Sequence, residues 1–408
     1  MERVYASVDI GSDSIKVVVC ELYHNHLNLL AATNVPSNGV KKGLIVEPNL
    51  AKEALISALK KTEDMLGVRI KRVIATVAGH FNSYKIIRGE SEVASDLISG
   101  DDIINSYKDG IKKNLPVTDE FVTVVPIDFT INGKTIIKDP KNFPGETLAG
   151  RAMMVSAPKK NVYAVASLIE SIGVELADIS VGSIGDINAF KNKELSENVS
   201  AIINIGGDMT MVSLYNKGIP VSSKIIGIGG KEIDKDLSYT FRIDLDEAKK
   251  IKEKFALASS KNADKTDYYE TTDFEGKKVR LNQLEVSEVC ETRIHEILNL
   301  AKKEIGDLTN KQIKYIIVTG GVSNMADFST SLNDVMFSAI KGNIKLIGVR
   351  DNMYSTAIGN IIYFLNTLKL KGMDYSMLSE GDMDRLSSPK SNNNETVLGK
   401  VFGYFFGE

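Results

Sequence analysis

The sequence is poor in residues that mark several functional classes. Its two cysteines, Cys20 and Cys290, lie far apart in apolar segments, so we expect packing roles rather than a disulfide framework or a metal cluster. The net charge of −3 gives no basic surplus for bulk nucleic-acid binding. No run of about 18 apolar residues predicts a membrane-spanning helix, and the first residues lack the pattern of a secretory signal peptide. These absences favour a reducing, cytosolic compartment and partners other than nucleic acid.

A repeated strand pattern dominates what the sequence does contain. The first 80 residues predict three strands, a helix that follows Pro48 and a buried fourth strand. The three-strand pattern returns at Ser200, where residues 204–206 correspond to residues 9–11. With 408 residues and a hydrophobic content of 43%, the chain is long enough for several domains. The repeat predicts a duplicated domain whose two halves face each other.

Three glycine turns follow strands of these halves, at residues 9–12, 204–208 and 319–321. Glycine lets a backbone approach a ligand closely and point its N–H groups at phosphate oxygens. One such turn alone is typical of a plain hairpin. Three of them, two in the duplicated setting, predict a nucleotide held between the halves.

Side chains beside the turns suit a metal–phosphate ligand. Ser12, Ser14 and Thr210 offer hydroxyl donors, and Asp9 is expected to hold Mg²⁺ through water. Lys16 either reaches a phosphate or lies on the exposed side of its strand.

The order of these motifs resembles the actin, heat-shock-70 and sugar-kinase superfamily, and within it the FtsA family of bacterial cell-division proteins. The likeness covers nearly the whole chain and rests on DIGSDSIK, INIGGDMT, VTGGVSNMADF, STAIGN and the region near ISVGSIGDINAF. Between residues 81 and 160, a capping-box candidate at residues 99–102 and a hairpin signal at Asn132-Gly133 predict an inserted α+β subdomain. FtsA proteins carry such an insertion, called 1C. The resemblance therefore implies an α/β, actin-like fold with duplicated nucleotide-binding halves and an FtsA-type 1C insertion.

The resemblance also implies how the chain is divided. The parts are subdomain 1A (1–80, 163–195 and 354–371), subdomain 1C (81–162), subdomain 2A (199–224 and 309–353), subdomain 2B (225–308), a disordered linker (372–394) and an amphipathic membrane-targeting helix (395–408).

ATP and Mg²⁺ are the cofactors that the resemblance implies, and Asp9 and Asp208 are expected near the metal. The residues expected at the nucleotide are Asp9, Gly11, Ser12, Asp13, Ser14, Lys16, Asn204, Gly206, Gly207, Asp208, Thr210, Gly229, Gly230, Lys252, Gly320, Gly321, Ser323 and Asn324.

The chain departs from many relatives at three of these positions. Asn204 replaces an aspartate, Asp208 replaces a third glycine, and Asp13 stands where a hydroxyl residue is more usual. An amide can orient a water but cannot take a proton from it, so we expect ATP to be hydrolysed slowly, if at all. The alternative is that Asp208 takes over the metal role.

Residues 395–408 predict a membrane contact. Their apolar side chains recur on one helical face: Val397, Leu398, Val401, Phe402, Phe405 and Phe406. The segment is too short to span a bilayer and rich in glycine, so we expect it to fold only in the membrane interface. With one lysine against two glutamates, binding would rest on aromatic burial and depend weakly on salt. The alternative, a core helix, would not follow a polar linker.

The resemblance implies three kinds of protein partner. Subdomain 2B would bind the C-terminal tail of FtsZ, a tubulin-like division protein, and Arg293 and Asn299 are the expected contacts. Its basic surroundings contain Lys249, Lys250, Lys252, Lys254, Lys302 and Lys303. The alternative is that these charges form only a solvated helix face. The chain would also self-associate into protofilaments, and 1C would contact other division proteins.

These features favour a peripheral scaffold on the cytoplasmic side of the cell membrane. A sugar or acetate kinase would need an acidic catalytic residue where Asn204 stands, and it has no use for a lipid helix. A pilus-assembly relative shares 1C but generally lacks the linker and the amphipathic helix. A chaperone is not expected, because no peptide-binding β-sandwich domain remains.

Overall fold

Two five-stranded sheets with the same strand order form the centre of the protein, which a computed structural model describes over residues 3–387. In the first half the order is β11-β6-β1-β2-β3, with β1 (Arg3–Ile10), β2 (Ser14–Tyr23), β3 (His26–Pro36), β6 (Arg72–Val77) and β11 (Glu175–Val181). In the second half the order is β18-β17-β12-β13-β14, with β12 (Val199–Ile205), β13 (Thr210–Asn216), β14 (Ile219–Ile226), β17 (Tyr315–Thr319) and β18 (Ala339–Lys341). The duplication predicted from the repeat is confirmed.

The first turn of each half has the same hydrogen bond. The backbone N–H of Gly11 donates to the carbonyl oxygen of Ser14 at 3.2 Å, and that of Gly206 donates to Met209 at 2.9 Å. Each turn joins two antiparallel strands, and the next strand of the sheet runs parallel to the first. The two turns therefore lie at corresponding edges of the two sheets.

Helices cover the sheets and join the halves. They are α1 (Pro48–Leu66), α3 (Lys159–Glu170), α4 (Gly182–Ala189), α5 (Lys193–Glu197), α9 (Phe328–Val335) and α10 (Ser355–Lys371). The chain also forms the short strands β4 (Val40–Lys41) and β5 (Leu44–Ile45), and 3₁₀ turns at Ser260–Asn262, Gly321–Asn324 and Asn352–Tyr354. α1 has Pro48 in its first turn and ends at Gly67 in the left-handed region, as helix-capping preferences predict. α4 and α10 run between the two sheets and touch at Gly185 and Gly359.

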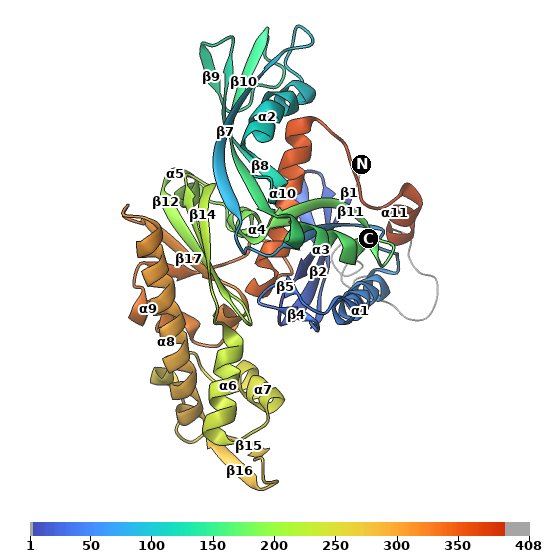
Figure 1. Ribbon diagram of the computed structural model, residues 1–408. Helices are drawn as coiled ribbons and strands as arrows, with labels where there is room; N and C mark the ends of the chain where they lie inside the picture. Colours follow the sequence, from blue (N-terminus) through green and yellow to red (C-terminus); the bar gives the residue numbers. More distant parts are fainter. Residues whose placement is uncertain (1–2, 388–408) are drawn as a thin grey trace, which may run out of the picture.

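A small α+β lobe lies at one end of the molecule (Figure 1). Its sheet has the order β7-β10-β8-β9, with β7 (Ser83–Glu92), β8 (Asp119–Ile131), β9 (Thr135–Ile137) and β10 (Thr147–Pro158), and helix α2 (Gly100–Asn114) packs on it. The capping box is confirmed, because the side chains of Ser99 and Asp102 each accept a hydrogen bond from the other's backbone N–H. Asn132 and Gly133 both have positive φ, which fits the predicted hairpin turn.

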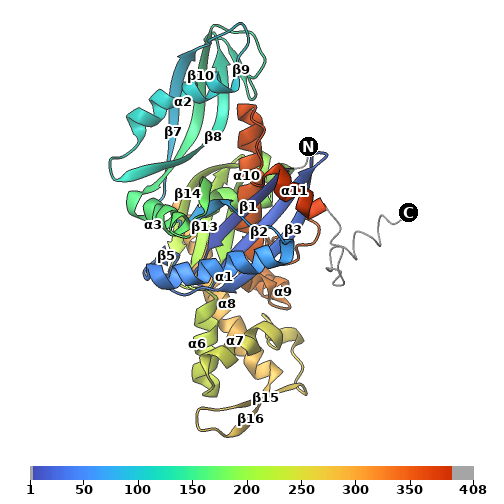
Figure 2. The ribbon, with the colours of Figure 1, turned by 90° about the vertical axis from the view of Figure 1, so that its right-hand side faces the viewer.

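A helical lobe lies at the opposite end (Figure 2). It contains α6 (Gly230–Phe241), α7 (Leu245–Lys254), α8 (Gln283–Leu308) and the hairpin of β15 (Tyr268–Thr272) and β16 (Lys278–Asn282). Side chains of this lobe and of the second sheet form one continuous apolar core, which includes Ile251 and Cys290. The helical lobe and the second half are therefore one packing unit. Both cysteines are buried and unpaired, so their predicted packing role is confirmed.

Residues 372–387 are not the disordered linker that the polar composition predicts. Residues 374–387, here called the docked segment, run along β1 and end in α11 (Glu380–Ser387). The backbone N–H of Met377 donates to the carbonyl oxygen of Val4 at 2.9 Å, and Met377 and Leu378 are buried in the core of the first half. Buried apolar side chains and a series of hydrogen bonds to β1, in which side chains also take part, hold a segment that looks polar in isolation.

The remaining C-terminal expectations cannot be compared with the fold. Residues 388–394 of the expected linker and the apolar face of residues 395–408 lie outside the described residues. Within residues 3–387, no helix is long and apolar enough to cross a bilayer.

Candidate functional site

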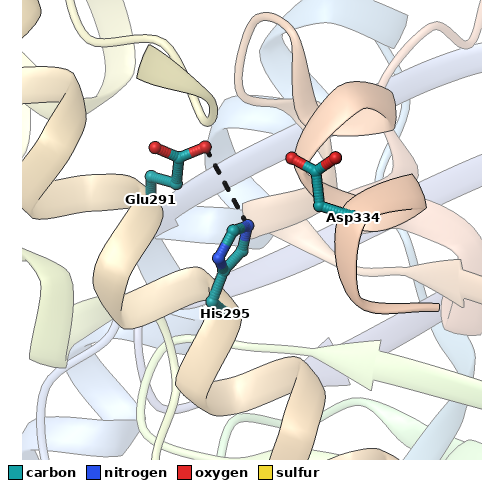
Figure 3. A group of neighbouring side chains, drawn as sticks. All are labelled: Glu291, His295 and Asp334. Carbon is teal, nitrogen blue, oxygen red and sulfur yellow. Dashed lines mark ion pairs between the residues drawn. The ribbon is translucent and has the colours of Figure 1, made fainter. Parts of the chain in front are cut away.

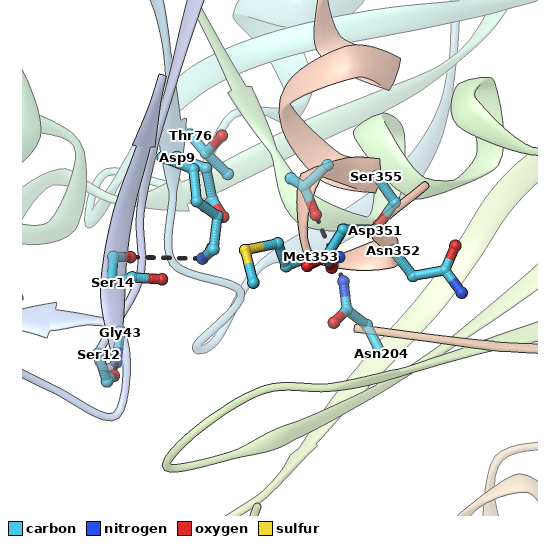
Figure 4. A network of polar contacts seen from close by, with 12 residues as sticks. Asp9, Ser12, Ser14, Gly43, Thr76, Asn204, Asp351, Asn352, Met353 and Ser355 are labelled. Atoms are coloured by element: carbon cyan, nitrogen blue, oxygen red, sulfur yellow. Dashed lines mark hydrogen bonds and ion pairs between the residues drawn. The ribbon is translucent and has the colours of Figure 1, made fainter. Parts of the chain in front are cut away.

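A cavity of about 390 Å³ lies between the halves, where the three glycine turns meet. A smaller one of about 120 Å³ adjoins it and shares several lining residues, among them Asp9 and Asn204. Figure 4 shows Asp9 and Ser14 on one side and Asn204 and Met353 on the other. The larger volume falls in the range of small-molecule sites.

Most residues expected at the nucleotide line these cavities. They are Asp9, Gly11, Ser12, Asp13, Ser14, Lys16, Asn204, Gly206, Gly207, Asp208, Gly230, Lys252, Gly320, Gly321 and Asn324. Thr210, Gly229 and Ser323 do not. The hydroxyl of Thr210 donates to the carbonyl oxygen of Ile228, and that of Ser323 donates to Gly320, so both hydroxyls serve the local backbone. Gly229 instead packs against the carbonyl oxygen of Gly206.

Among the residues of the three glycine turns, Gly320 occupies the position that most strictly requires glycine. Its φ is +92°, and a Cβ atom there would lie 2.4 Å from the carbonyl oxygen of Ile205. Only glycine combines this conformation with this close approach. The third glycine turn thus brings β17 against the end of β12, beside the cavity.

Lys16 lies inside the cleft rather than on an exposed strand face, so that alternative is wrong. Its ammonium group contacts Asp9 at 3.0 Å and the carbonyl oxygen of Ser14 at 3.3 Å, and its side chain is 13% exposed. Register explains the contact, because Asp9 and Lys16 are direct partners in the β1–β2 ladder. The carboxylate expected near the metal is therefore paired with an ammonium group.

Asp186, on α4, is a residue that the sequence reasoning missed. It is fully buried and accepts hydrogen bonds from Asn204 at 2.9 Å, Thr356 at 2.8 Å and Ser355 at 3.0 Å. Burial raises the pKa of Asp186 to about 6, and these donors limit the rise. Nothing in the sequence GSIGDINA marks Asp186 as part of a functional site, so only its position beside Asn204 in the fold could have identified it.

Asp186 also explains why an amide stands at position 204. The amide Nδ2 of Asn204 donates to Asp186 and, at 3.3 Å, to Thr356. An aspartate at 204 would place two carboxylates in contact inside the protein. Asp186 lines neither cavity, so it orients Asn204 without facing the cleft.

Asn204→Asp should therefore destabilise the fold in a pH-dependent way. At about pH 8 the buried pair must either carry two negative charges in contact or hold a proton that the unfolded chain would release, and we expect a loss of about 3 kcal/mol in the free energy of unfolding. At about pH 5 one group keeps its proton and donates it to the other, so the loss should shrink. Urea denaturation at both pH values measures this.

The double variant Asp186→Asn with Asn204→Asp is the control, because it exchanges the two groups and restores a single charge. It should recover most of the stability at about pH 8. Equal losses for the single variant at both pH values would refute the carboxylate contact.

The residues expected at the FtsZ tail have different surroundings. Arg293, on α8, donates to both carboxylate oxygens of Asp236, at 2.6 and 3.0 Å, and also contacts Glu296. Asn299 is exposed on the same helix. Lys249 and Lys252 line the cavity, so these two charges belong to the cleft rather than to a tail-binding surface.

A group of three potential metal ligands lies away from the cleft (Figure 3). Glu291 and His295 are on α8 and Asp334 is on α9, and their ligand atoms lie within 4.8 Å of one another. The ammonium group of Lys261 contacts both carboxylate oxygens of Asp334, at 2.6 and 2.7 Å. The hydroxyls of Ser259 and Ser260 donate to Glu291. We read the group as a polar cluster in which the turn at Ser260–Asn262 connects α8 with α9.

Comparisons with known proteins agree with this geometry. A family model described as "Cell division protein FtsA" matches residues 201–359, and one described as "Type IV pilus assembly protein PilM" matches residues 7–265. The cell division protein FtsA of Bacillus subtilis is 27% identical over 375 residues, which are 91% of this chain and 85% of that protein. Further curated relatives from Staphylococcus, Streptococcus and Enterococcus carry the same name.

Solved structures show the fold. The PilM–PilN type IV pilus biogenesis complex matches with a TM-score of 0.57 at 14% identity, over 90% of this chain and 98% of that one. MreB5 of Spiroplasma citri bound to ADP matches with a TM-score of 0.53 at 13% identity, over the same shares of the two chains. The chain has the actin-like fold of these proteins, with two sheet-containing halves around a cleft.

Proposed function

The chain belongs to the group that the FtsA and PilM family models describe and, within it, to the FtsA family of bacterial cell-division proteins, and from this membership we propose that it binds ATP between its halves. We propose further that it self-associates on the inner face of the cell membrane and tethers FtsZ filaments there. The observation that most supports nucleotide binding is the cavity that three glycine turns of two equivalent sheets line together. The match to an ADP-bound MreB5 supports the nucleotide class.

The residues of the cleft fit a magnesium–nucleotide complex. The side chains of Asp9 and Asp208 offer oxygen ligands for Mg²⁺, and the lysines beside them offer charge to phosphate groups. The bound metal would neutralise part of the charge on the phosphate chain. The donor set in the cleft therefore suits both partners of the complex.

We propose that hydrolysis is slow. Asn204 lines the cavity where a proton acceptor would be needed, and its amide orients a water without deprotonating it. The nearest acid, Asp186, lies behind it with three donors on its two oxygens. Bound ATP would then serve to hold the halves together.

Membrane attachment is assigned to residues 395–408 on their sequence pattern. The docked segment supports this proposal because it fixes residue 387 against the first half, through contacts such as that of Asp382 with Lys71 at 3.0 Å. At most seven residues then separate this fixed point from the apolar segment. Such a tether, about 25 Å when fully extended, would keep the first half close to the membrane.

Sedimentation with lipid vesicles tests the proposal. We expect the full chain to carry a peptide of the FtsZ C-terminal tail into the vesicle pellet. A chain that ends at Ser387 should bind the peptide equally in solution but leave it in the supernatant. Vesicle binding that survives this truncation would contradict the membrane assignment, and failure of the full chain to bind the peptide would contradict the FtsZ assignment.

A role in pilus assembly is the second candidate, because the PilM family model matches residues 7–265. The solved complex of PilM with PilN suggests the comparison to make. In the same assay, binding of a PilN-derived peptide without binding of the FtsZ tail would favour this candidate.

A further inference from the structure

Three carboxylates around the cleft each contact one lysine. The pairs are Asp9 with Lys16 at 3.0 Å, Asp13 with Lys249 at 2.8 Å, and Asp208 with Lys231 at 2.9 Å. Every acid that the sequence predicted near a nucleotide or its metal therefore has a cationic partner in this structure.

The Asp13–Lys249 pair connects the halves, and Lys231, whose partner Asp208 belongs to its own half, reaches the first half through a separate contact. Asp13 belongs to the turn between β1 and β2, whereas Lys249 is on α7, whose Ile251 is in the core shared with the second sheet. Lys231, at the start of α6, also donates to the carbonyl oxygen of Ser12 at 3.0 Å. These contacts hold the first glycine turn against the second half.

The two turns are also in direct contact at this point. A Cβ atom on Gly207 would lie 2.7 Å from the Cβ atom of Asp13. Asp13 and Lys249 therefore meet at the mouth of the second glycine turn, where phosphate groups of a nucleotide would be held.

Exposure separates the lysines that are free to change partners from those that are not. The side chains of Lys231 and Lys249 are each 36% exposed. Lys252 is 10% exposed, with its ammonium group between Asp234, at 2.7 Å, and the carbonyl oxygen of Gly230, at 3.1 Å. Lys16 is similarly enclosed.

The Asp13–Lys249 pair is ionised at neutral pH. Burial alone would raise the pKa of Asp13, but the hydrogen bond from Lys249 and the charges of nearby lysines lower it below its usual value. Burial likewise acts to lower the pKa of Lys249, and the contact with Asp13 outweighs it, so that pKa is raised. A charged ammonium group, paired with a charged carboxylate, therefore lines the cavity.

We propose that Lys231 and Lys249 are the ligands that the second half supplies to the phosphate chain of the nucleotide, and that Asp208 and Asp13 hold them in position until it binds. The inference rests on the proposed binding of ATP. Phosphate oxygens replace the carboxylates as partners of the two ammonium groups, so the halves stay connected through the nucleotide. Because both lysines move with the second half, the exchange links nucleotide binding to the position of that half.

Equilibrium titration of the full-length chain with ATP tests this proposal. Lys231→Met and Lys249→Met should each weaken ATP binding by about tenfold or more, since each removes a charged hydrogen bond to phosphate. Adenosine binding should not change, because it lacks the phosphates. Asp13→Asn should strengthen ATP binding several-fold, since it releases Lys249 and removes a negative charge near the phosphates.

Lys250→Met is the matched control. Lys250 is the neighbour of Lys249 on α7, but its side chain is 57% exposed and pairs with Glu247 outside the cavity. It should bind ATP like the parent. Unchanged ATP affinity in both Lys231→Met and Lys249→Met would overturn this inference alone, whereas a parent chain that binds no ATP would overturn the proposed function and the inference with it.

Discussion

Replacing Gly359 by alanine is expected to destabilise the protein by about 3 kcal/mol or more, although alanine normally stabilises a helix. A Cβ atom at this position would lie 1.7 Å from the carbonyl oxygen of Gly185, and 2.9 Å from the backbone nitrogen of Ala189. Both atoms are backbone, so α4 and α10 would have to move apart. These two helices lie between the sheets, and their separation would also displace Asp186 from Thr356.

Gly306→Ala is the matched control for this prediction. Gly306 lies in α8, and a Cβ atom there meets nothing within 4 Å. The control should be stabilised by up to about 1 kcal/mol, because alanine loses less backbone entropy than glycine. Opposite signs in urea denaturation are the predicted result, and equal effects of the two substitutions would refute the close crossing.

A chain that ends at Met373 should be less stable than one that ends at Ser387, by roughly 3 to 6 kcal/mol. The shorter chain loses the buried side chains of Met377 and Leu378 and the contact of Asp382 with Lys71. It also uncovers the core around Phe364, whose ring packs edge-on against Tyr375.

Both truncated chains lack residues 388–408, so their difference isolates the docked segment. Chemical denaturation of the two chains measures it. A difference below about 1 kcal/mol would mean that the segment adds nothing to the core and that the sequence-based expectation of a disordered linker was right after all.

The features that could be predicted from the sequence are those that local chemistry determines. The repeated strand pattern with its glycine turns predicted the two equivalent sheets, and Ser99 with Asp102 predicted the start of α2. Asn132 and Gly133 marked a hairpin, because both accept positive φ. In these cases the residues that decide the structure are close together in the chain.

The features that were missed depend on contacts between distant segments. Lys249 looks like part of a solvated charge run until the first half is placed against α7. Asp186 lacks any motif, and its role depends on Asn204 and Thr356 from two other elements. Residues 374–387 look polar, since their few apolar side chains pack against a core that β1 helps to form from the other end of the chain.

Titration of the unaltered chain with ATP in the presence of Mg²⁺ tests the central claim most directly. The account predicts saturable binding of one ATP per chain, accompanied by a rise in the midpoint of thermal unfolding, because the ligand binds only the folded state. The absence of saturable binding and of any thermal shift would contradict the claim that the cleft between the halves is a nucleotide site.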